Sequence, residues 1–182
     1  MQAPPHAVLG PRRPPRPMAF PGHELWRGAF ITWGVLAVLL LLLDVILGWG
    51  TGNIIGWLGT TFHVLLFALT IAAVATVIGT GFAFLVGTAL QRVRAWPVHV
   101  IAHGLVAAAV GVLTIVAVVF VVFGPSRDWS DPTASAVLSA FAAGSALAAV
   151  VGWVWTSRIA LREDAAYDSV QREAGLDARS EP

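Results

Sequence analysis

Cysteine and lysine are both absent from this 182-residue chain. Without cysteine there can be no disulfide, no thiolate metal ligand and no cysteine nucleophile. All eleven basic residues are arginines, a usage that hints at a GC-rich bacterial genome. Charged residues of either sign make up only 12% of the chain, whereas hydrophobic residues make up 57%. This composition is far from that of a soluble domain and predicts a membrane protein.

Charge is missing altogether from the stretch 57–90, which contains no Asp, Glu, Lys or Arg. Because a helix rises about 1.5 Å per residue, about 20 residues cross a hydrocarbon core of about 30 Å, and this stretch is long enough. Three other apolar runs satisfy the same criterion. We therefore predict an all-α fold, an integral membrane four-helix bundle of up-down topology within residues 25–157, with helices at about 26–50, 57–90, 96–123 and 132–157.

The two ends of the chain are polar. Residues 1–24 form a tail rich in proline and arginine, and within it residues 1–21 cannot form a helix and are expected to be extended or disordered. Such a tail could bind an aromatic-lined groove or anionic headgroups, although a solvated tail that helps to set orientation is the favoured interpretation. Residues 158–182 are charged and alanine-rich, and we expect a short helical extension that stops near Gly175.

The placement of arginine predicts the orientation. Ten of the eleven arginines lie before the first helix, in the second loop or after the fourth helix, and only Arg127 lies in the third loop. Basic residues in short connections stay on the cytoplasmic side of a membrane, so both termini are predicted to be cytoplasmic. Tryptophans near the predicted helix ends agree with these boundaries. The predicted location is a bacterial cytoplasmic (plasma) membrane, crossed in several passes.

Two of the predicted helices carry small residues at four-residue spacing. The second helix has Ala75, Gly79, Ala83 and Gly87, with a neighbouring row of Ala68, Ala72, Thr76 and Thr80. The fourth helix has Ala136, Ala140, Gly144, Ala148, Gly152 and Thr156. Small residues let helix backbones approach closely in lipid, where no hydrophobic force holds helices together. We predict that both rows contact other helices, and that leucine at Gly144 or Gly152 loosens the fold or its oligomer.

One carboxylate interrupts the first helix. A carboxylate inside a membrane span costs about 2.5 to 3.5 kcal/mol on insertion scales, so Asp44 needs a partner. Asp44 and His63 lie at similar distances from the first hairpin, each about 9 Å deep by the helical rise. We predict a hydrogen bond between Asp44 and His63 and interpret it as a structural clasp. The alternative is a proton- or cation-responsive site in the outer half of the bundle.

The remaining histidines lie near the other side of the membrane. His99 and His103 are one helical turn apart, and His23 with Glu24 precedes the first helix. Two imidazoles at this spacing match a zinc or iron ligand pair, but a closed site needs further ligands that are scarce here. We therefore favour interfacial histidines with local hydrogen bonds, and expect no cofactor. Haem between helices is disfavoured because His63 lies near the opposite surface.

No motif indicates a particular reaction. The serines of the fourth helix have no histidine or aspartate at a matching depth, and no phosphate-binding glycine loop follows a strand. The lack of a soluble basic domain excludes nucleic-acid binding. The leading hypothesis is a non-enzymatic membrane subunit or scaffold whose partners are the lipid bilayer and a second copy or a larger membrane complex. The alternatives are a small transporter or channel-like protein using Asp44 and His63, and a metal-dependent enzyme using His99 and His103.

Overall fold

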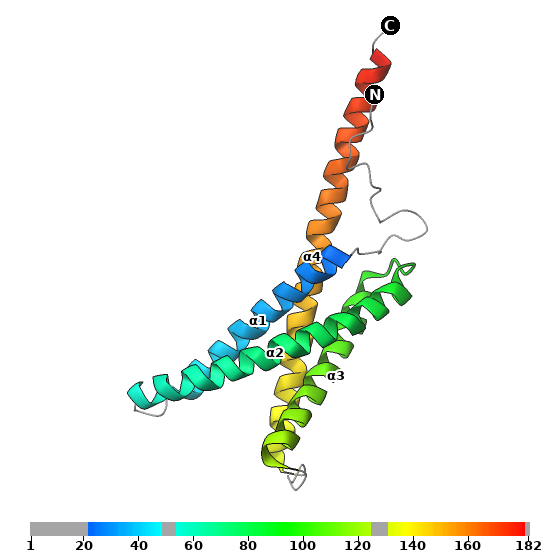
Figure 1. Cartoon of the computed structure of the whole chain (residues 1–182). Helices are drawn as coiled ribbons and strands as arrows, with labels where there is room; N and C mark the ends of the chain where they lie inside the picture. Colours follow the sequence, from blue (N-terminus) through cyan, green and yellow to red (C-terminus); the bar gives the residue numbers. More distant parts are fainter. Residues whose placement is uncertain (1–21, 49–53, 125–130, 181–182) are drawn as a thin grey trace.

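The chain folds into four α-helices in the computed structural model, which describes residues 22–48, 54–124 and 131–180. The helices are α1 (Gly22–Gly48), α2 (Ile54–Leu90), α3 (Trp96–Phe123) and α4 (Pro132–Ser180) (Figure 1). Each helix contains a stretch that is long and apolar enough to cross a membrane. The prediction of an all-α chain with four such helices is therefore confirmed for the described residues.

Helix boundaries differ from the predicted ones at three places. α1 begins at Gly22 rather than near residue 26, and its first turn contains Glu24, whose negative charge interacts favourably with the helix N-terminus. α2 begins at Ile54 rather than near residue 57. α4 passes through Gly175 without a break and ends at Ser180, because alanine, arginine and glutamate propagate a helix that is already nucleated.

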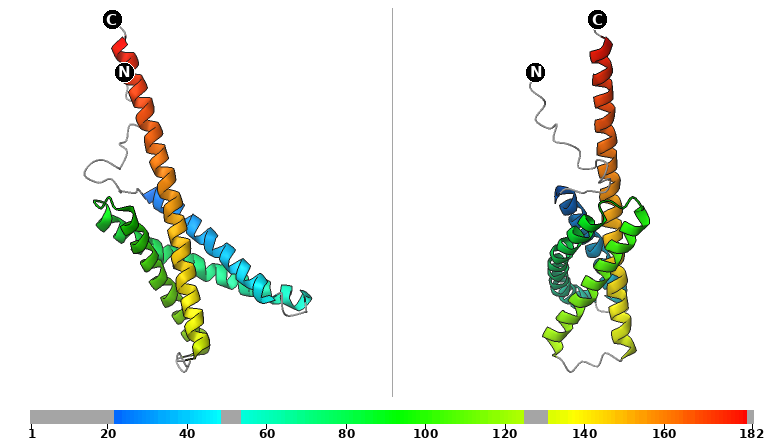
Figure 2. Two further views of the ribbon diagram at one scale, coloured as in Figure 1. Left: turned by 180° about the vertical axis from the view of Figure 1, so that it is seen from behind. Right: turned by 90° about the vertical axis from the view of Figure 1, so that its right-hand side faces the viewer.

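The four helices are arranged as two pairs. α1 lies alongside α2 and α3 alongside α4, and contacts between the pairs run from α1 to α4 and from α2 to α3. Figures 1 and 2 show that the pairs approach each other where α1 and α3 begin and diverge toward their other ends. The C-terminal part of α4 projects beyond the other helices. The shared end is therefore where residues from all four helices can meet.

Close packing between α1 and α4 depends on glycine. A Cβ atom on Gly152 would lie 2.9 Å from the carbonyl oxygen of Gly28 and would overlap the hydroxyl of Thr32. A Cβ atom on Gly28 would lie 3.3 Å from Oγ1 of Thr156. No larger residue fits at Gly152 without moving one helix, so the two backbones approach as closely as glycine allows.

Close packing between α3 and α4 also depends on glycine. A Cβ atom on Gly111 would lie 3.1 Å from the carbonyl oxygen of Phe141 and would overlap the side chain of Ser145. One on Gly104 would lie 3.3 Å from Cγ2 of Val150. Helix interfaces built from glycine, alanine and serine let the backbones themselves pack, which is typical of helices in lipid.

Large apolar side chains lie on the outside instead. In the described part of the chain, every buried hydrophobic residue is an alanine, namely Ala29, Ala134, Ala148 and Ala160. Leucine, valine and phenylalanine are largely exposed, and Val121 reaches 82%. This distribution is the reverse of that in a water-soluble bundle.

The two rows of small residues differ in how closely they pack against other helices. In α4, Ala148, Gly152 and Thr156 are buried, whereas Ala136 and Ala140 are exposed and a Cβ atom on Gly144 would meet nothing within 4 Å. Only the C-terminal half of this row therefore packs within the chain, and leucine at Gly144 has no intramolecular contact to disturb.

In α2 the row is only half-buried. Ala75, Gly79, Ala83 and Gly87 are partly covered, and a Cβ atom on Gly79 would lie 3.8 Å from Cγ1 of Val110 in α3. A Cβ atom on Gly87 would meet nothing within 4 Å. This row faces a space rather than a closely packed backbone.

Candidate functional site

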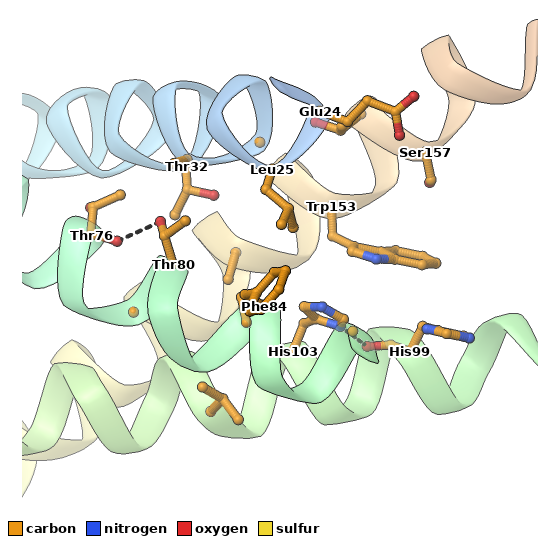
Figure 3. A pocket seen from close by; sticks show the side chains of 18 of the residues that line it. Glu24, Leu25, Thr32, Thr76, Thr80, Phe84, His99, His103, Trp153 and Ser157 are labelled. Atoms are coloured by element: carbon orange, nitrogen blue, oxygen red, sulfur yellow. Dashed lines mark hydrogen bonds between the residues drawn. The ribbon is translucent and has the colours of Figure 1, made fainter. Parts of the chain in front are cut away.

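A cavity of about 170 Å³ lies at the shared end of the helices, and all four of them line it (Figure 3). It exists because small residues face it, where larger side chains would fill the space. These residues are Gly28 and Ala29 of α1, Gly79, Ala83 and Gly87 of α2, and Ala149 of α4. The small-residue row of α2 thus forms a wall of this cavity.

Polar side chains at the wall of the cavity are unusually well buried. Glu24 is 2% exposed and His99 1%, and His103, Thr156 and Ser157 are also buried. Burying a polar group costs free energy unless the group is hydrogen-bonded, so the partners of these side chains matter.

Both imidazoles are held by backbone carbonyl groups. The Nε2 atom of His99 donates to the carbonyl oxygen of Val93 at 2.8 Å, which ties the start of α3 to the preceding loop. The Nδ1 atom of His103 donates to the carbonyl oxygen of His99 at 2.8 Å. A carbonyl oxygen can only accept, so these bonds determine which ring nitrogen carries the proton in each neutral imidazole.

Trp153 of α4 packs against both histidines. Its ring is parallel to that of His99, with centroids 5.5 Å apart and an interplanar angle of 9°. The centroid of His103 lies 5.7 Å from that of Trp153, and Trp96 approaches the same indole at 5.8 Å. These ring contacts join α3 to α4 at the wall of the cavity.

Glu24 reaches the same region from α1. Figure 3 shows its side chain beside α4, near Ser157 and above the ring of Trp153. An ion pair between Arg27 and Glu163, with Nη1 and Oε1 3.1 Å apart, joins α1 to α4 further along and does not line the cavity. This ion pair holds the first turns of α1 against α4.

Thr156 is a polar group without a partner. In the described part of the chain, its Oγ1 atom is the buried side-chain oxygen that makes no hydrogen bond. This oxygen faces Gly28, within the close contact between α1 and α4. An unsatisfied buried hydroxyl costs about 1 to 3 kcal/mol, so the close helix contact is made despite this cost.

Three of the four predicted ligand residues lie at the same cavity, and the fourth does not. His99 and His103 line the cavity together with Glu24, whereas His23 is exposed to the outside. Within the described ranges, no three His, Cys, Asp or Glu side chains gather closely enough to hold a metal ion. His99 and His103 each make a hydrogen bond to a nearby backbone carbonyl group, and their interpretation as interfacial histidines stays a prediction.

Asp44 lies elsewhere, between α1 and α2. Its Oδ1 atom accepts a hydrogen bond from Oγ1 of Thr61 at 3.3 Å. The side chain of His63 lies outside the described part of the structure, so the Asp44–His63 pair stays a prediction. Asp44 does not line the cavity.

Several cavity residues were not singled out from the sequence for chemistry. Trp153, Ser157 and Phe84 belong to long apolar helices in which nothing marks one face as polar. Trp153 is one of the tryptophans near the predicted helix ends, and its position in the sequence indicates nothing more. The sequence did single out His99, His103, Glu24 and the small-residue row of α2, but not that they border one cavity.

Comparison with protein-family models, curated proteins and solved structures finds no match to this chain. The function is therefore argued from the fold and the cavity.

Proposed function

We propose that this chain is a multi-pass integral membrane protein, with four membrane-spanning helices and both termini in the cytoplasm, that works as a non-enzymatic subunit in a membrane assembly. The observation that carries the proposal is the reversed distribution of side chains. The buried hydrophobic residues of the described part are alanines, and the large aliphatic residues are exposed. In water this surface would cause aggregation, whereas hydrocarbon is a suitable solvent for it.

The arginines support the orientation. Arg27, Arg92, Arg94 and Arg158 lie close to the shared end of the helices, and Arg127 belongs to the loop between α3 and α4. Short connections rich in arginine remain in the cytoplasm, so the shared end and both termini are assigned to that side.

The role as a subunit rests on surface that the chain does not cover itself. In the N-terminal half of α4, Ala136 and Ala140 are exposed and Gly144 faces open space. The C-terminal half of the same row packs tightly against α1 through Gly152. A neighbouring chain, either a second copy or a larger membrane partner, can use the uncovered half in the way that α1 uses the other half.

The orientation can be tested cleanly because the chain has no cysteine. We expect Ser126→Cys to react with a membrane-impermeant maleimide in intact cells, and Ser180→Cys to react only after the membrane is opened. Detection by gel shift on the full chain suffices. Reaction of both variants in the same compartment would overturn the proposed orientation.

The role as a subunit is tested separately by native mass spectrometry after mild extraction. We expect the wild-type protein to carry a second copy or a partner, and Gly144→Leu to release it. The matched control is Gly81→Leu, an open and exposed position on α2. A wild-type protein that is only monomeric and partner-free would overturn this role, as would equal assembly in both leucine variants.

A further inference from the structure

We propose that the cavity among the four helices binds a phenol, that is, a neutral molecule of one aromatic ring with one hydroxyl group. The ring lies between Phe84 and Trp153, and the hydroxyl donates to Nε2 of His103. This is a binding site and does not depend on the assembly role proposed above. Four features of the cavity carry the inference: its volume, the absence of an available charge, its aromatic rings and the acceptor on His103.

The volume of the cavity limits the ligand to about one ring. The cavity measures about 170 Å³, and most of its wall surface is apolar. For comparison, an apolar protein cavity of about 150 Å³ binds one molecule of benzene. The space therefore suits a single six-membered ring with a small substituent, and is too small for two fused rings with substituents.

No charge at the wall is left for a ligand. Among the described residues that line the cavity, Glu24 is the only one with a formal charge, since none of the arginines lines it. Glu24 is 2% exposed and already makes an interaction within the protein. An ion that leaves water for an enclosed, mainly apolar site needs an opposite charge there. The cavity therefore favours a neutral ligand over an ammonium ion or a carboxylate.

Aromatic rings border the cavity from two helix pairs. His99, His103 and Trp153 contact one another where α3 meets α4. Phe84 of α2 takes no part in these contacts, and Figure 3 shows the ring of His103 projecting toward it from α3. Aromatic rings attract one another in offset and edge-to-face arrangements. A ligand ring in this space can contact Phe84 and the α3–α4 rings together, which a small aliphatic molecule cannot do as favourably.

His103 offers a hydrogen-bond acceptor to the cavity. Its Nδ1 donates to the carbonyl oxygen of His99, so Nε2 of the neutral imidazole carries the lone pair. Within the described residues Nε2 makes no hydrogen bond. The buried side-chain nitrogen and oxygen atoms without a partner are limited there to Oγ1 of Thr156, so Nε2 is accessible rather than sealed. Because His103 lines the cavity, a ligand hydroxyl can donate to it.

The other polar groups at the wall also suit a hydroxyl, which both donates and accepts. Several wall hydroxyls donate to carbonyl oxygens of their own helices and keep lone pairs: Thr76, Thr80 and Thr88 at 2.7 Å and Ser157 at 3.0 Å. Donors are present as well, because Thr32, Gln91 and Thr156 line the same cavity. A mixed wall of this kind does not select for a pure donor such as an ammonium group.

Five probes separate these features: phenol, benzene, cyclohexanol, benzylamine and benzoate. Binding to the full chain in nanodiscs is measured by titration calorimetry, with empty nanodiscs as the background. We expect saturable binding of phenol, about fivefold or more tighter than that of benzene, which is the contribution of one hydrogen bond. We also expect weaker binding of cyclohexanol and no saturable binding of the charged probes. Equal affinities for phenol and benzene, or for phenol and cyclohexanol, would overturn the proposal, as would tightest binding of a charged probe.

A first variant tests the hydrogen bond to His103. His103→Phe removes Nε2 and keeps a flat ring, and we expect phenol binding to weaken by about fivefold while benzene binding changes little. The control is His23→Phe, the same change at an exposed histidine outside the cavity, which leaves both affinities unchanged. Phenol binding by His103→Phe at the wild-type affinity would overturn the assigned acceptor.

A second variant tests the cavity itself, and keeps the proposal testable if His103→Phe fails to fold. Gly87→Leu places a side chain in the space that Gly87 leaves open, and we expect it to abolish saturable phenol binding. Gly81→Leu adds the same side chain at an exposed position of α2 outside the cavity, and we expect binding to be unchanged. Phenol binding by Gly87→Leu at the wild-type affinity would overturn the site.

Discussion

The close contact between α1 and α4 leads us to predict that replacing a helical glycine by alanine lowers the stability of the fold, the opposite of the usual effect. Alanine is a better helix former than glycine by about 1 kcal/mol, so Gly→Ala within a helix normally stabilises it. At Gly152 the added methyl group would lie 2.9 Å from the carbonyl oxygen of Gly28 and would overlap the hydroxyl of Thr32. The carbonyl oxygen of Gly28 is a backbone atom and cannot move aside as a side chain could, so α1 and α4 must separate. We therefore expect Gly152→Ala to destabilise the fold.

The size of the effect follows from the cost of overpacking. Extra methyl groups in a closely packed interface cost about 1 to 3 kcal/mol of stability. Because leucine adds more atoms than alanine, we expect Gly152→Leu to lose more stability than Gly152→Ala. For a chain of this length about 1 kcal/mol lowers the melting temperature by about 2 to 4 °C, so we expect about 5 to 10 °C for leucine.

The assay is thermal unfolding in one detergent at one scan rate, because irreversible unfolding depends on the rate of heating. Gly81→Leu adds the same side chain at a position that is open in the structure, and we expect it to melt within about 2 °C of the wild-type protein. A stabilised Gly152→Ala variant, or equal melting temperatures for the two leucine variants, would refute the close contact between α1 and α4.

Two further predictions concern the polar contacts between helices. Asp44→Asn keeps an oxygen that can accept the hydrogen bond from Thr61, so we expect the melting temperature in detergent to fall by less than about 3 °C; a larger fall would contradict a purely structural clasp. Glu163→Gln breaks an exposed ion pair with Arg27 and should cost less than about 1 kcal/mol, because water screens such pairs; a clear loss of stability in the same assay would show that the pair matters more than its exposure indicates.

The helices could be predicted because their signal is local. The charge-free stretch 57–90, which makes up most of α2, and the run ending at Phe123 are each longer than a membrane crossing requires, whatever the rest of the chain does. The continuation of α4 past Ser157 was only partly predicted, because a charged segment is stable as a helix here by extending one that is already formed.

The cavity could not be predicted, because it depends on which faces meet. The row that contains Gly79 and Gly87 has the same spacing as the row that contains Gly152, yet one borders a space and the other a backbone. Spacing shows that a face is flat but not what lies against it. Likewise, nothing in the sequence places Trp153 against His99, since that contact requires the relative rotation of α3 and α4.

The unbroken course of α4 has a mechanical consequence. If α4 turned about its close contact at Gly152, the segment from this pivot to Ser180 would be a lever about 42 Å long at 1.5 Å per residue. Because a continuous helix turns as a rigid lever, a rotation of about 5° at the pivot would swing the far tip through about 4 Å. A small movement of α4 relative to α1 would therefore give a larger displacement at the end of α4, which a distance-sensitive label near Ser180 could measure.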